Sequence, residues 1–354
     1  MRLRIITITQ NINSAQNIRG GLLYSGMLNV NDNVEYKKII VKSSSGILGK
    51  VLNKIEVIYG IVQFLLTLKK GDIVYCYGDM PSSFIRALNI FRFKVIMERT
   101  EYPNAVLREG KEVEDESLKK LKNISAFVTC STALSNYYSS YFETKKVYSQ
   151  YYPVDVEPFK STISNRNRKG NYIAYAGYMG GNKDGLEDLI YSFSQILDTD
   201  IRLKLAGSAP LDELNALKGL VKKLKLVDRV IFLGNLDHHE IPNFYTEAKV
   251  CVLQRPNNIQ AKGGMPSKLL EYIASGTPTI VTDVGDISKI FTNKEHCYIV
   301  KSGNNNEFGK MIDHVLANYN EAKVIASQGV KLVKNHHFIA QADKLNEFIS
   351  KLND

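Results

Sequence analysis

One stretch, residues 263–286, holds the residue types best suited to bind a ligand, and it reads GGMPSKLLEYIASGTPTIVTDVGD. Gly263 and Gly264 carry no side chains, so a bulky ligand could approach their backbone closely. Pro266 suits the first position of a helix. The N-terminus of a helix offers unpaired N–H groups and the positive end of a dipole, and both favour a phosphate. The spacing therefore predicts an anion site at this helix start.

A carboxylate lies one turn further along the same expected helix. The helix is expected to run from Ser267 to just before Gly276, with a buried strand following at Thr279–Thr282. Glu271 lies on the same helix face as Ser267. Its carboxylate could accept hydrogen bonds from two vicinal hydroxyls, such as those of a ribose. The stretch thus predicts a site for both ends of a nucleoside diphosphate.

The elements that must position this stretch alternate between strand and helix along the whole chain. We expect strands at residues 2–9, 34–41, 72–76, 94–98, 126–130, 146–151, 171–176, 202–206, 229–233, 250–253, 279–282 and 297–300. Helices are expected at residues 22–30, 51–68, 81–91, 111–122, 132–142, 185–197, 211–224, 239–247, 267–275 and 338–352. Such alternation favours parallel sheets with helices on both faces.

The length of 354 residues favours two domains, because it is long for one hydrophobic core. The sequence predicts an α/β fold of two doubly wound, Rossmann-like domains that face a central cleft. Their expected bounds are 1–160 and 170–337, with a linker at 161–169 that has no apolar period. A C-terminal helix at 338–354 is expected to pack back on the first domain. Ligands of such sheets bind beyond the carboxyl ends of the strands.

The charge of the chain is +10, and its first 165 residues hold 22 Lys and Arg against 15 Asp and Glu. The first half therefore favours an anionic partner, such as an acidic membrane surface or a lipid diphosphate. A plainer alternative is that excess lysine only keeps the protein in solution. No signal-peptide pattern is present at the start, and the most apolar stretch, Ile55–Leu68, is shorter than the about 20 residues that cross a bilayer. We expect a cytoplasmic protein.

The sequence does not indicate a metal, redox, dinucleotide or nucleic-acid site. The four cysteines lie in apolar runs without metal or redox spacing, at positions Cys76, Cys130, Cys251 and Cys297. The sequence Asp198–Thr199–Asp200 has the D-x-D pattern of metal sites, but it falls between a helix and a strand and is interpreted as a turn. A full G-x-G-x-x-G is absent, and basic runs lack interleaved aromatics. We expect no metal, no cofactor and no nucleic-acid partner.

The motifs of the second half, in their order and spacing, resemble those of a known enzyme family. They are Ala176–Gly177 with Lys183, Leu205–Ser208, Phe232–Asn235, Pro266–Tyr272 and Ser275–Pro278. These residues resemble the nucleotide-sugar domain of retaining GT-B glycosyltransferases of family 4, also called glycosyl transferases group 1. The first half resembles the family more loosely, through its Gly20–Gly21 pair, Cys130–Leu134 and Pro153–Asp155.

The resemblance implies a set of functional residues. Those implied to bind the donor are Gly20, Gly21, Gly177, Lys183, Gly207, Gly263, Gly264, Pro266, Ser267, Lys268, Leu269 and Glu271. Those implied to take part in catalysis are Glu98, Glu101 and Lys183. Glu271 would bind the ribose hydroxyls, and Lys183 would neutralise the donor diphosphate, alone or with Lys268. A fixed cation there stabilises charge that develops on the leaving group.

Two positions depart from the family pattern, and several assignments have plain structural alternatives. Gly263 stands where the family usually has a glutamate that contacts the donor sugar, and Tyr178 stands where it tends to have an arginine. Lys183 could be a solvated loop residue and Glu271 a surface glutamate. The pair Gly20–Gly21 follows the first strand and could approach the diphosphate or simply begin a helix. Glu98 and Glu101 could instead be a loop carboxylate pair.

The resemblance implies a metal-independent, hexosyl-type glycosyltransferase with an acceptor-binding first domain. It would move a sugar from a UDP-sugar, or second a GDP-sugar, to a glycan or lipid-linked glycan, with retention at the anomeric carbon. The implied setting is bacterial surface polysaccharide synthesis, such as capsule or exopolysaccharide, on the cytoplasmic face of the membrane. Two alternatives stay open: a nucleotide-sugar epimerase on the same fold, and a catalytically degenerate binding subunit of a glycan-assembly complex.

Overall fold

The computed structural model describes residues 2–9, 15–40, 47–78, 80–111, 118, 121, 124–142, 146–164 and 170–352. The chain divides into two compact units. Unit 1 comprises Met1–Pro153 together with Phe338–Asp354, and unit 2 comprises Val154–His337. Each unit is built around a parallel sheet of six strands, as the alternation of strand and helix predicts.

Unit 1 contains a sheet in the order β2-β1-β3-β4-β5-β6. Its elements are β1 (Leu3–Thr9), α1 (Ala15–Val30), β2 (Val34–Ile40), α2 (Ile47–Thr67), β3 (Ile73–Tyr77), α3 (Ser82–Ile90), β4 (Lys94–Arg99), α4 (Asn104–Glu109), β5 (Ala126–Thr129), α5 (Thr132–Ser139), β6 (Val147–Ser149) and the C-terminal α15 (Phe338–Lys351). The apolar strands β3 and β5 are buried along their whole length, because helices cover both faces of the sheet.

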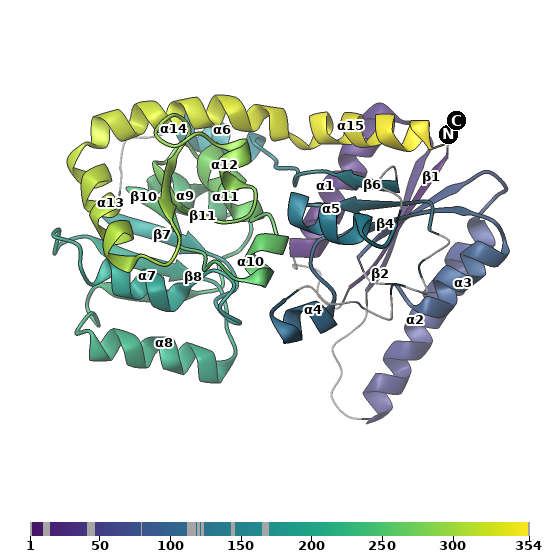
Figure 1. Cartoon of the computed structure of the whole chain (residues 1–354), viewed down its shortest axis with the longest axis horizontal. Helices are drawn as coiled ribbons and strands as arrows, with labels where there is room; N and C mark the ends of the chain where they lie inside the picture. The colour runs from purple at the N-terminus through teal and green to yellow at the C-terminus, as the bar shows by residue number, and fades with distance from the viewer. Residues whose placement is uncertain are drawn as a thin grey trace. The chain divides into compact units, whose positions relative to one another are not determined.

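The C-terminal helix α15 completes the core of unit 1. Its apolar face is buried against α1 and the sheet through Ala342, Leu345 and Ile349. Figure 1 shows α15 beside α1. Gly26 of α1 makes this close approach possible, since a Cβ there would lie 2.7 Å from the carbonyl oxygen of Phe338. The expected return of the last helix to the first domain is confirmed.

Unit 2 contains a sheet in the order β12-β11-β10-β7-β8-β9. Its elements are α6 (Glu157–Ser164), β7 (Tyr172–Ala176), α7 (Leu186–Phe193), β8 (Arg202–Ala206), α8 (Leu211–Lys223), β9 (Val230–Gly234), α9 (Ile241–Glu247), β10 (Val250–Leu253), α10 (Ile259–Gly263), α11 (Ser267–Ala274), β11 (Thr279–Asp283), α12 (Ile287–Ile290), β12 (Tyr298–Lys301), α13 (Asn305–Ala317), α14 (Tyr319–Val333) and the 3-10 helix η3 (Lys334–His336). Helices α7 and α8 pack together on one side of this sheet (Figure 1). Helices α9 and α11 pack on the other side, where the rings of Tyr245 and Tyr272 lie 4.7 Å apart.

Three sequence-based expectations need correction or fall outside the described residues. Gly20 and Gly21 do not form a loop before a helix, because α1 begins at Ala15 and both glycines lie inside it. The residues assigned to the start of the linker are helical, since α6 continues to Ser164. The helix expected at 111–122 lies mostly outside the described residues.

No helix in the described part of the chain combines the length and the hydropathy needed to cross a membrane.

The α1–α15 contact yields a stability test within one helix. We expect Gly26→Ala to destabilise the protein by about 1–3 kcal/mol, because the added Cβ meets the backbone of α15 and the helices must separate. Gly21→Ala is the matched control, because a Cβ there meets nothing within 4 Å. Alanine in a helix interior should then stabilise by about 0.5–1 kcal/mol. Thermal denaturation measures both, and a stable Gly26→Ala variant would contradict this packing.

Candidate functional site

The strand order of unit 2 places one crevice at the centre of its sheet. Strands β7 and β10 are neighbours, yet the chain continues from β7 to β8 on one side and from β10 to β11 on the other. Such a reversal leaves a crevice beyond the carboxyl ends of the two central strands, and ligands of open α/β sheets bind there. The loops after β7 and β10 carry Gly177, Lys183, Asp184, Arg255 and Gly264.

Two glycines let the loops after β7 and β8 lie close together. Gly177 has a φ of 156°, and Gly207 has a φ of 126°, so both adopt a backbone conformation that favours glycine. A Cβ on Gly207 would collide with the carbonyl oxygen of Gly177, and a Cβ on Gly177 would collide with the Nζ of Lys268. The glycine after β7 therefore makes room for the ammonium group of a lysine from α11.

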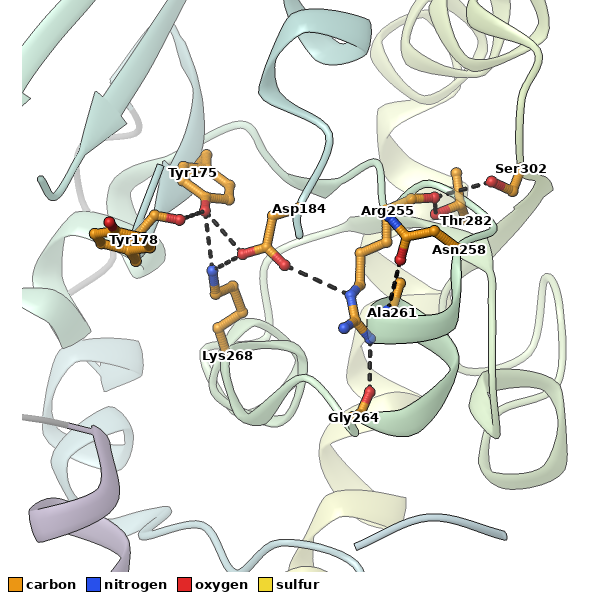
Figure 2. Close-up of polar contacts among 10 residues, drawn as sticks. All are labelled: Tyr175, Tyr178, Asp184, Arg255, Asn258, Ala261, Gly264, Lys268, Thr282 and Ser302. Atoms are coloured by element: carbon orange, nitrogen blue, oxygen red, sulfur yellow. Dashed lines mark hydrogen bonds and ion pairs between the residues drawn. The ribbon is translucent and has the colours of Figure 1, made fainter. Parts of the chain in front are cut away.

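A buried carboxylate organises the charges of the crevice. Asp184 is 7% exposed, and its Oδ2 accepts hydrogen bonds from the Nζ of Lys268 and, at 2.9 Å, from the hydroxyl of Tyr175. Its Oδ1 lies 3.5 Å from the Nε of Arg255. Figure 2 shows the carboxylate between the lysine and the arginine. One anion from the loop after β7 thus bridges two cations from the segment that connects β10 to β11.

The charge state of this cluster follows from its surroundings. Burial raises the pKa of the Asp184 carboxyl, but Lys268 and Arg255 outweigh burial and hold that pKa below its ordinary value. Burial and the neighbouring Asp184 raise the pKa of the Tyr175 phenol well above its ordinary value. Asp184 is therefore ionised at neutral pH and Tyr175 keeps its proton. Two cations against one anion leave the cluster with a net positive charge.

Arg255 fixes the loop after β10 from inside the protein. Its side chain is 1% exposed, and its Nη1 donates a hydrogen bond of 2.7 Å to the carbonyl oxygen of Gly264. Its own carbonyl oxygen accepts hydrogen bonds from the hydroxyls of Thr282 at 2.8 Å and Ser302 at 2.9 Å (Figure 2). The arginine therefore connects the Asp184 carboxylate to the backbone just before α11.

A second lysine lies beside the same backbone. An ideal Cβ on Gly264 would lie 3.7 Å from both the Cε of Lys183 and the Nη2 of Arg255. Lys183 is half-buried and directly precedes Asp184 in the loop after β7. The structure thus brings Lys183, Gly264 and the start of α11 together, as the resemblance implies.

The N-terminus of α11 completes the cluster. Pro266 precedes the helix and has no N–H, and Ser267 and Lys268 follow in the first turn, both half-buried. Leu269 is fully buried, and its N–H donates to the carbonyl oxygen of Pro266 at 3.1 Å. Glu271 is half-buried one turn later. The positive end of the helix dipole and the ammonium of Lys268 therefore lie at one place, which suits an anion.

Gly263 has a different setting from the one expected. It is the last residue of the short helix α10, not part of a free glycine loop, and it is buried. Asn258 begins α10 by accepting a hydrogen bond of 2.8 Å from the N–H of Ala261. Of the two glycines, only Gly264 lies in the segment between α10 and α11.

The two glutamates proposed for catalysis lie in different environments of unit 1. Glu98 is 9% exposed, and its Oε2 accepts a hydrogen bond of 2.6 Å from the hydroxyl of Tyr75. Burial and the Glu98 carboxylate raise the pKa of Tyr75 well above its ordinary value, so the phenol remains the donor. Glu98 also lines a small pocket of unit 1 together with Tyr77, Gln150 and Gln341. Glu101 lies after β4 and is exposed.

The sequence analysis missed Asp184 and Tyr175. The acidic residue directly after Lys183 was the available signal, but its partners Arg255 and Lys268 are remote in sequence. The interpretation of Asp198 as part of a turn is confirmed, since its carboxylate accepts the N–H groups of Asp200 and Ile201 at 2.9 and 3.1 Å. Among the described residues, no group of three or more His, Cys, Asp or Glu side chains could hold a metal ion.

Comparison with protein families and curated proteins gives concordant matches. The model of the family described as Glycosyl transferases group 1 matches residues 156–332, half of the chain. An uncharacterized glycosyltransferase of Methanocaldococcus jannaschii is 24% identical over 288 residues, which cover 75% of this chain and 72% of that protein. The mannosylfructose-phosphate synthase of Agrobacterium fabrum is 34% identical over 136 residues, which cover 36% of this chain. That match spans only 29% of the synthase's length.

Solved structures with similar folds cover nearly the whole chain. Anabaena HepE, solved in complex with UDP, has a TM-score of 0.75 at 14% identity and matches over 99% of this chain and 100% of its own. The sucrose-phosphate synthase of Thermosynechococcus elongatus has a TM-score of 0.74 at 17% identity, with 99% of each chain covered. At these identities the likeness shows the fold, which is the two-domain, Rossmann-like GT-B architecture.

The ionised Asp184 predicts a pH-dependent contribution to stability. We expect Asp184→Asn to cost about 3 kcal/mol at pH 7, because the buried Arg255 and the half-buried Lys268 lose their counter-charge. Since the folded-state pKa of Asp184 is lowered, its contribution is complete above the ordinary aspartate value of about 4 and is lost below it. Thermal denaturation at several pH values should show the difference shrinking as the pH falls through this range.

The exposed Asp228→Asn is the matched control and should change stability little at any pH. A penalty for Asp184→Asn that stayed constant down to pH 3 would contradict an ionised, bridging carboxylate.

Proposed function

Because this chain belongs to the glycosyl transferases group 1 family, we propose that it is a retaining, family 4 glycosyltransferase that uses a nucleotide sugar. The observation that carries the proposal is the positive cluster at the crevice of unit 2. Lys268, Lys183 and the N-terminus of α11 converge where such sheets bind their ligands. This is the arrangement that a donor diphosphate requires.

The diphosphate would be bound by Lys268 and Lys183. Tyr178 stands where the family tends to have an arginine, and Lys268 would take over the role of that arginine. The Nζ of Lys268 lies against Gly177, the residue before Tyr178. Its ammonium has three donors, of which the structure assigns one to Asp184 and one, at 3.0 Å, to the hydroxyl of Tyr175. Asp184 would hold this ammonium in place for the ligand.

Chemistry at this site would depend on charge stabilisation. When the bond between the sugar and the diphosphate of the donor breaks, negative charge develops on the departing diphosphate. Fixed cations lower the energy of that transition state. Two lysines and the dipole of α11 would supply that charge without a divalent metal. The acceptor hydroxyl would then attack from the face that the diphosphate leaves, which retains the configuration of the sugar.

The remaining donor contacts follow the same reasoning. Glu271, one turn beyond Lys268, would bind the two ribose hydroxyls, and Gly264 would let the diphosphate approach the backbone. UDP is our first choice of nucleotide and GDP our second, and HepE was solved with UDP and with UDP-glucose. Gly263 leaves the sugar undetermined, because it stands where a glutamate usually contacts that part of the donor.

The acceptor side is proposed for unit 1. The basic excess of the first half supports an acceptor linked to a lipid diphosphate, as in capsule or exopolysaccharide synthesis at the cytoplasmic face of the membrane. Glu98 and Glu101 are the proposed acidic residues near the reacting sugar. The pocket that Glu98 lines combines polar side chains, those of Tyr77, Gln150 and Gln341, with apolar ones, and the polar groups could bind hydroxyls.

A nucleotide-binding panel tests the donor site. A ligand at 100 times its dissociation constant stabilises a protein by about 2.7 kcal/mol, which should raise the denaturation midpoint by several degrees. We expect such a shift with one of UDP, GDP, ADP and CMP, and its loss in Lys183→Ala and in Lys268→Ala. Lys222→Ala, an exposed lysine of α8, is the control and should keep the shift.

The departures at Tyr178 and Gly263 favour one second candidate, a degenerate binding subunit. No shift with any nucleotide would contradict the donor site and support that candidate. A nucleotide-sugar epimerase would instead convert its donor with no acceptor present, which a product assay would reveal.

A further inference from the structure

One face of α2 exposes several large apolar side chains to solvent. Its exposed large apolar side chains are Val51, Leu52, Ile55, Ile58, Tyr59, Val62 and Leu66, with exposed fractions between 45% and 81%. Steps of three and four residues relate them, so they lie on one continuous stripe about a third of the helix circumference wide. We call these seven residues the α2 stripe.

The opposite face of α2 already anchors the helix to unit 1. Phe64 is buried against Phe84 of α3, with ring centroids 6.1 Å apart, and Gly60 packs closely on Ile39 of β2. The stripe is therefore not the core-facing side of the helix. From Val51 to Leu66 the stripe is about 22 Å long, at 1.5 Å of rise per residue. Contiguous apolar patches of this kind mark interaction sites on soluble domains.

Helix α3 lies beside α2 (Figure 1), and its C-terminal end also exposes large apolar side chains. Ile90 and Phe91 are 69% and 68% exposed there. The C-terminal ends of α2 and α3 both lead directly into strands, β3 and β4, which are parallel neighbours in the sheet. The two helix ends therefore lie at the same edge of the sheet, opposite to the edge where ligands bind.

The exposed charges of α2, α3 and the segments that follow them are mainly basic. The exposed basic residues are Lys54, Lys69, Lys70, Arg86, Arg92 and Lys94. Over the described residues of α2, α3 and the segments that follow them to 71 and 94, the one exposed acidic residue is Glu56. An apolar face with six exposed basic residues near it and one acidic residue is complementary to a surface that is apolar inside and negatively charged outside.

We propose that the α2 stripe, with Ile90 and Phe91, docks unit 1 on an anionic lipid bilayer. The apolar side chains would enter the boundary between headgroups and acyl chains, and the lysines and arginines would contact lipid phosphates. The helix would lie along the bilayer surface, because its apolar side chains occupy one face only. The inference does not depend on which sugar, nucleotide or acceptor the protein uses.

A second copy of this chain fits the same face less well. Leu52, Ile55, Tyr59, Val62 and Leu66 do follow the alternating three- and four-residue steps of a coiled coil. Coiled-coil partners pair opposite charges beside their apolar seam, however, and two copies would bring the same basic residues together. Charge therefore favours the lipid surface.

Vesicle flotation of the full chain tests the proposal. We expect wild-type protein to float with vesicles of equal parts phosphatidylglycerol and phosphatidylcholine, and at least about tenfold less with phosphatidylcholine alone. The variant Ile55→Glu/Val62→Glu should lose at least about tenfold in binding to the anionic vesicles. The control Leu197→Glu/Leu211→Glu introduces the same two charges at exposed leucines of unit 2, with exposures of 82% and 74%, and should float like wild type.

A charge variant keeps the test decisive in case the apolar variant fails to fold, which circular dichroism would show. Lys69→Glu/Lys70→Glu leaves the stripe intact and should also lose at least about tenfold in binding to anionic vesicles, as should wild type in high salt. Equal flotation of wild type with both vesicle types, or no flotation, would overturn the proposal. So would a wild-type dimer in light scattering that does not float and that Ile55→Glu/Val62→Glu converts to a monomer.

Discussion

The ion pairs of Asp184 are the interaction on which the site of unit 2 depends. Lys268 and Arg255 both belong to the connection between β10 and β11, and without the carboxylate from the loop after β7 their positive groups would repel each other. One carboxylate, itself buried and held by Tyr175, brings them together. Its position directly after Lys183 means that the same loop supplies a cation and the anion that organises the others.

The surrounding backbone is shaped to permit this cluster. The glycine after β7 leaves space that the ammonium of Lys268 occupies, and the carbonyl oxygen of Gly264 accepts from Arg255. Both features lie at the reversal of strand order, where the sheet leaves a crevice beyond its carboxyl edge. The net positive charge is thus presented at the place where the fold can admit a ligand. This combination explains why a site for an anionic leaving group is proposed in unit 2.

The bounds of the strands were predictable where a glycine follows the strand or a proline precedes it. Strand β8 has the expected bounds because Gly207 follows it, and β11 begins at the expected Thr279 because Pro278 precedes it. The start of α1 was not predictable, since Gly20 and Gly21 suggest a break, but tertiary packing of that helix on α15 outweighs their low helix propensity. The motif residues Lys183, Gly264 and Lys268 were correctly expected to lie together. Asp184 was missed because its two partners come from positions 71 and 84 residues away in sequence.

The affinity difference between UDP and UMP tests the central claim most directly, because the two ligands differ by the phosphate that Lys268 would bind. Isothermal titration calorimetry of wild type and Lys268→Ala measures it. We expect wild type to prefer UDP by at least about tenfold, which a single charge-assisted hydrogen bond can supply. Lys268→Ala should lose most of that preference and bind UMP much as before. An unchanged preference in Lys268→Ala would contradict the assignment of this cluster to the diphosphate.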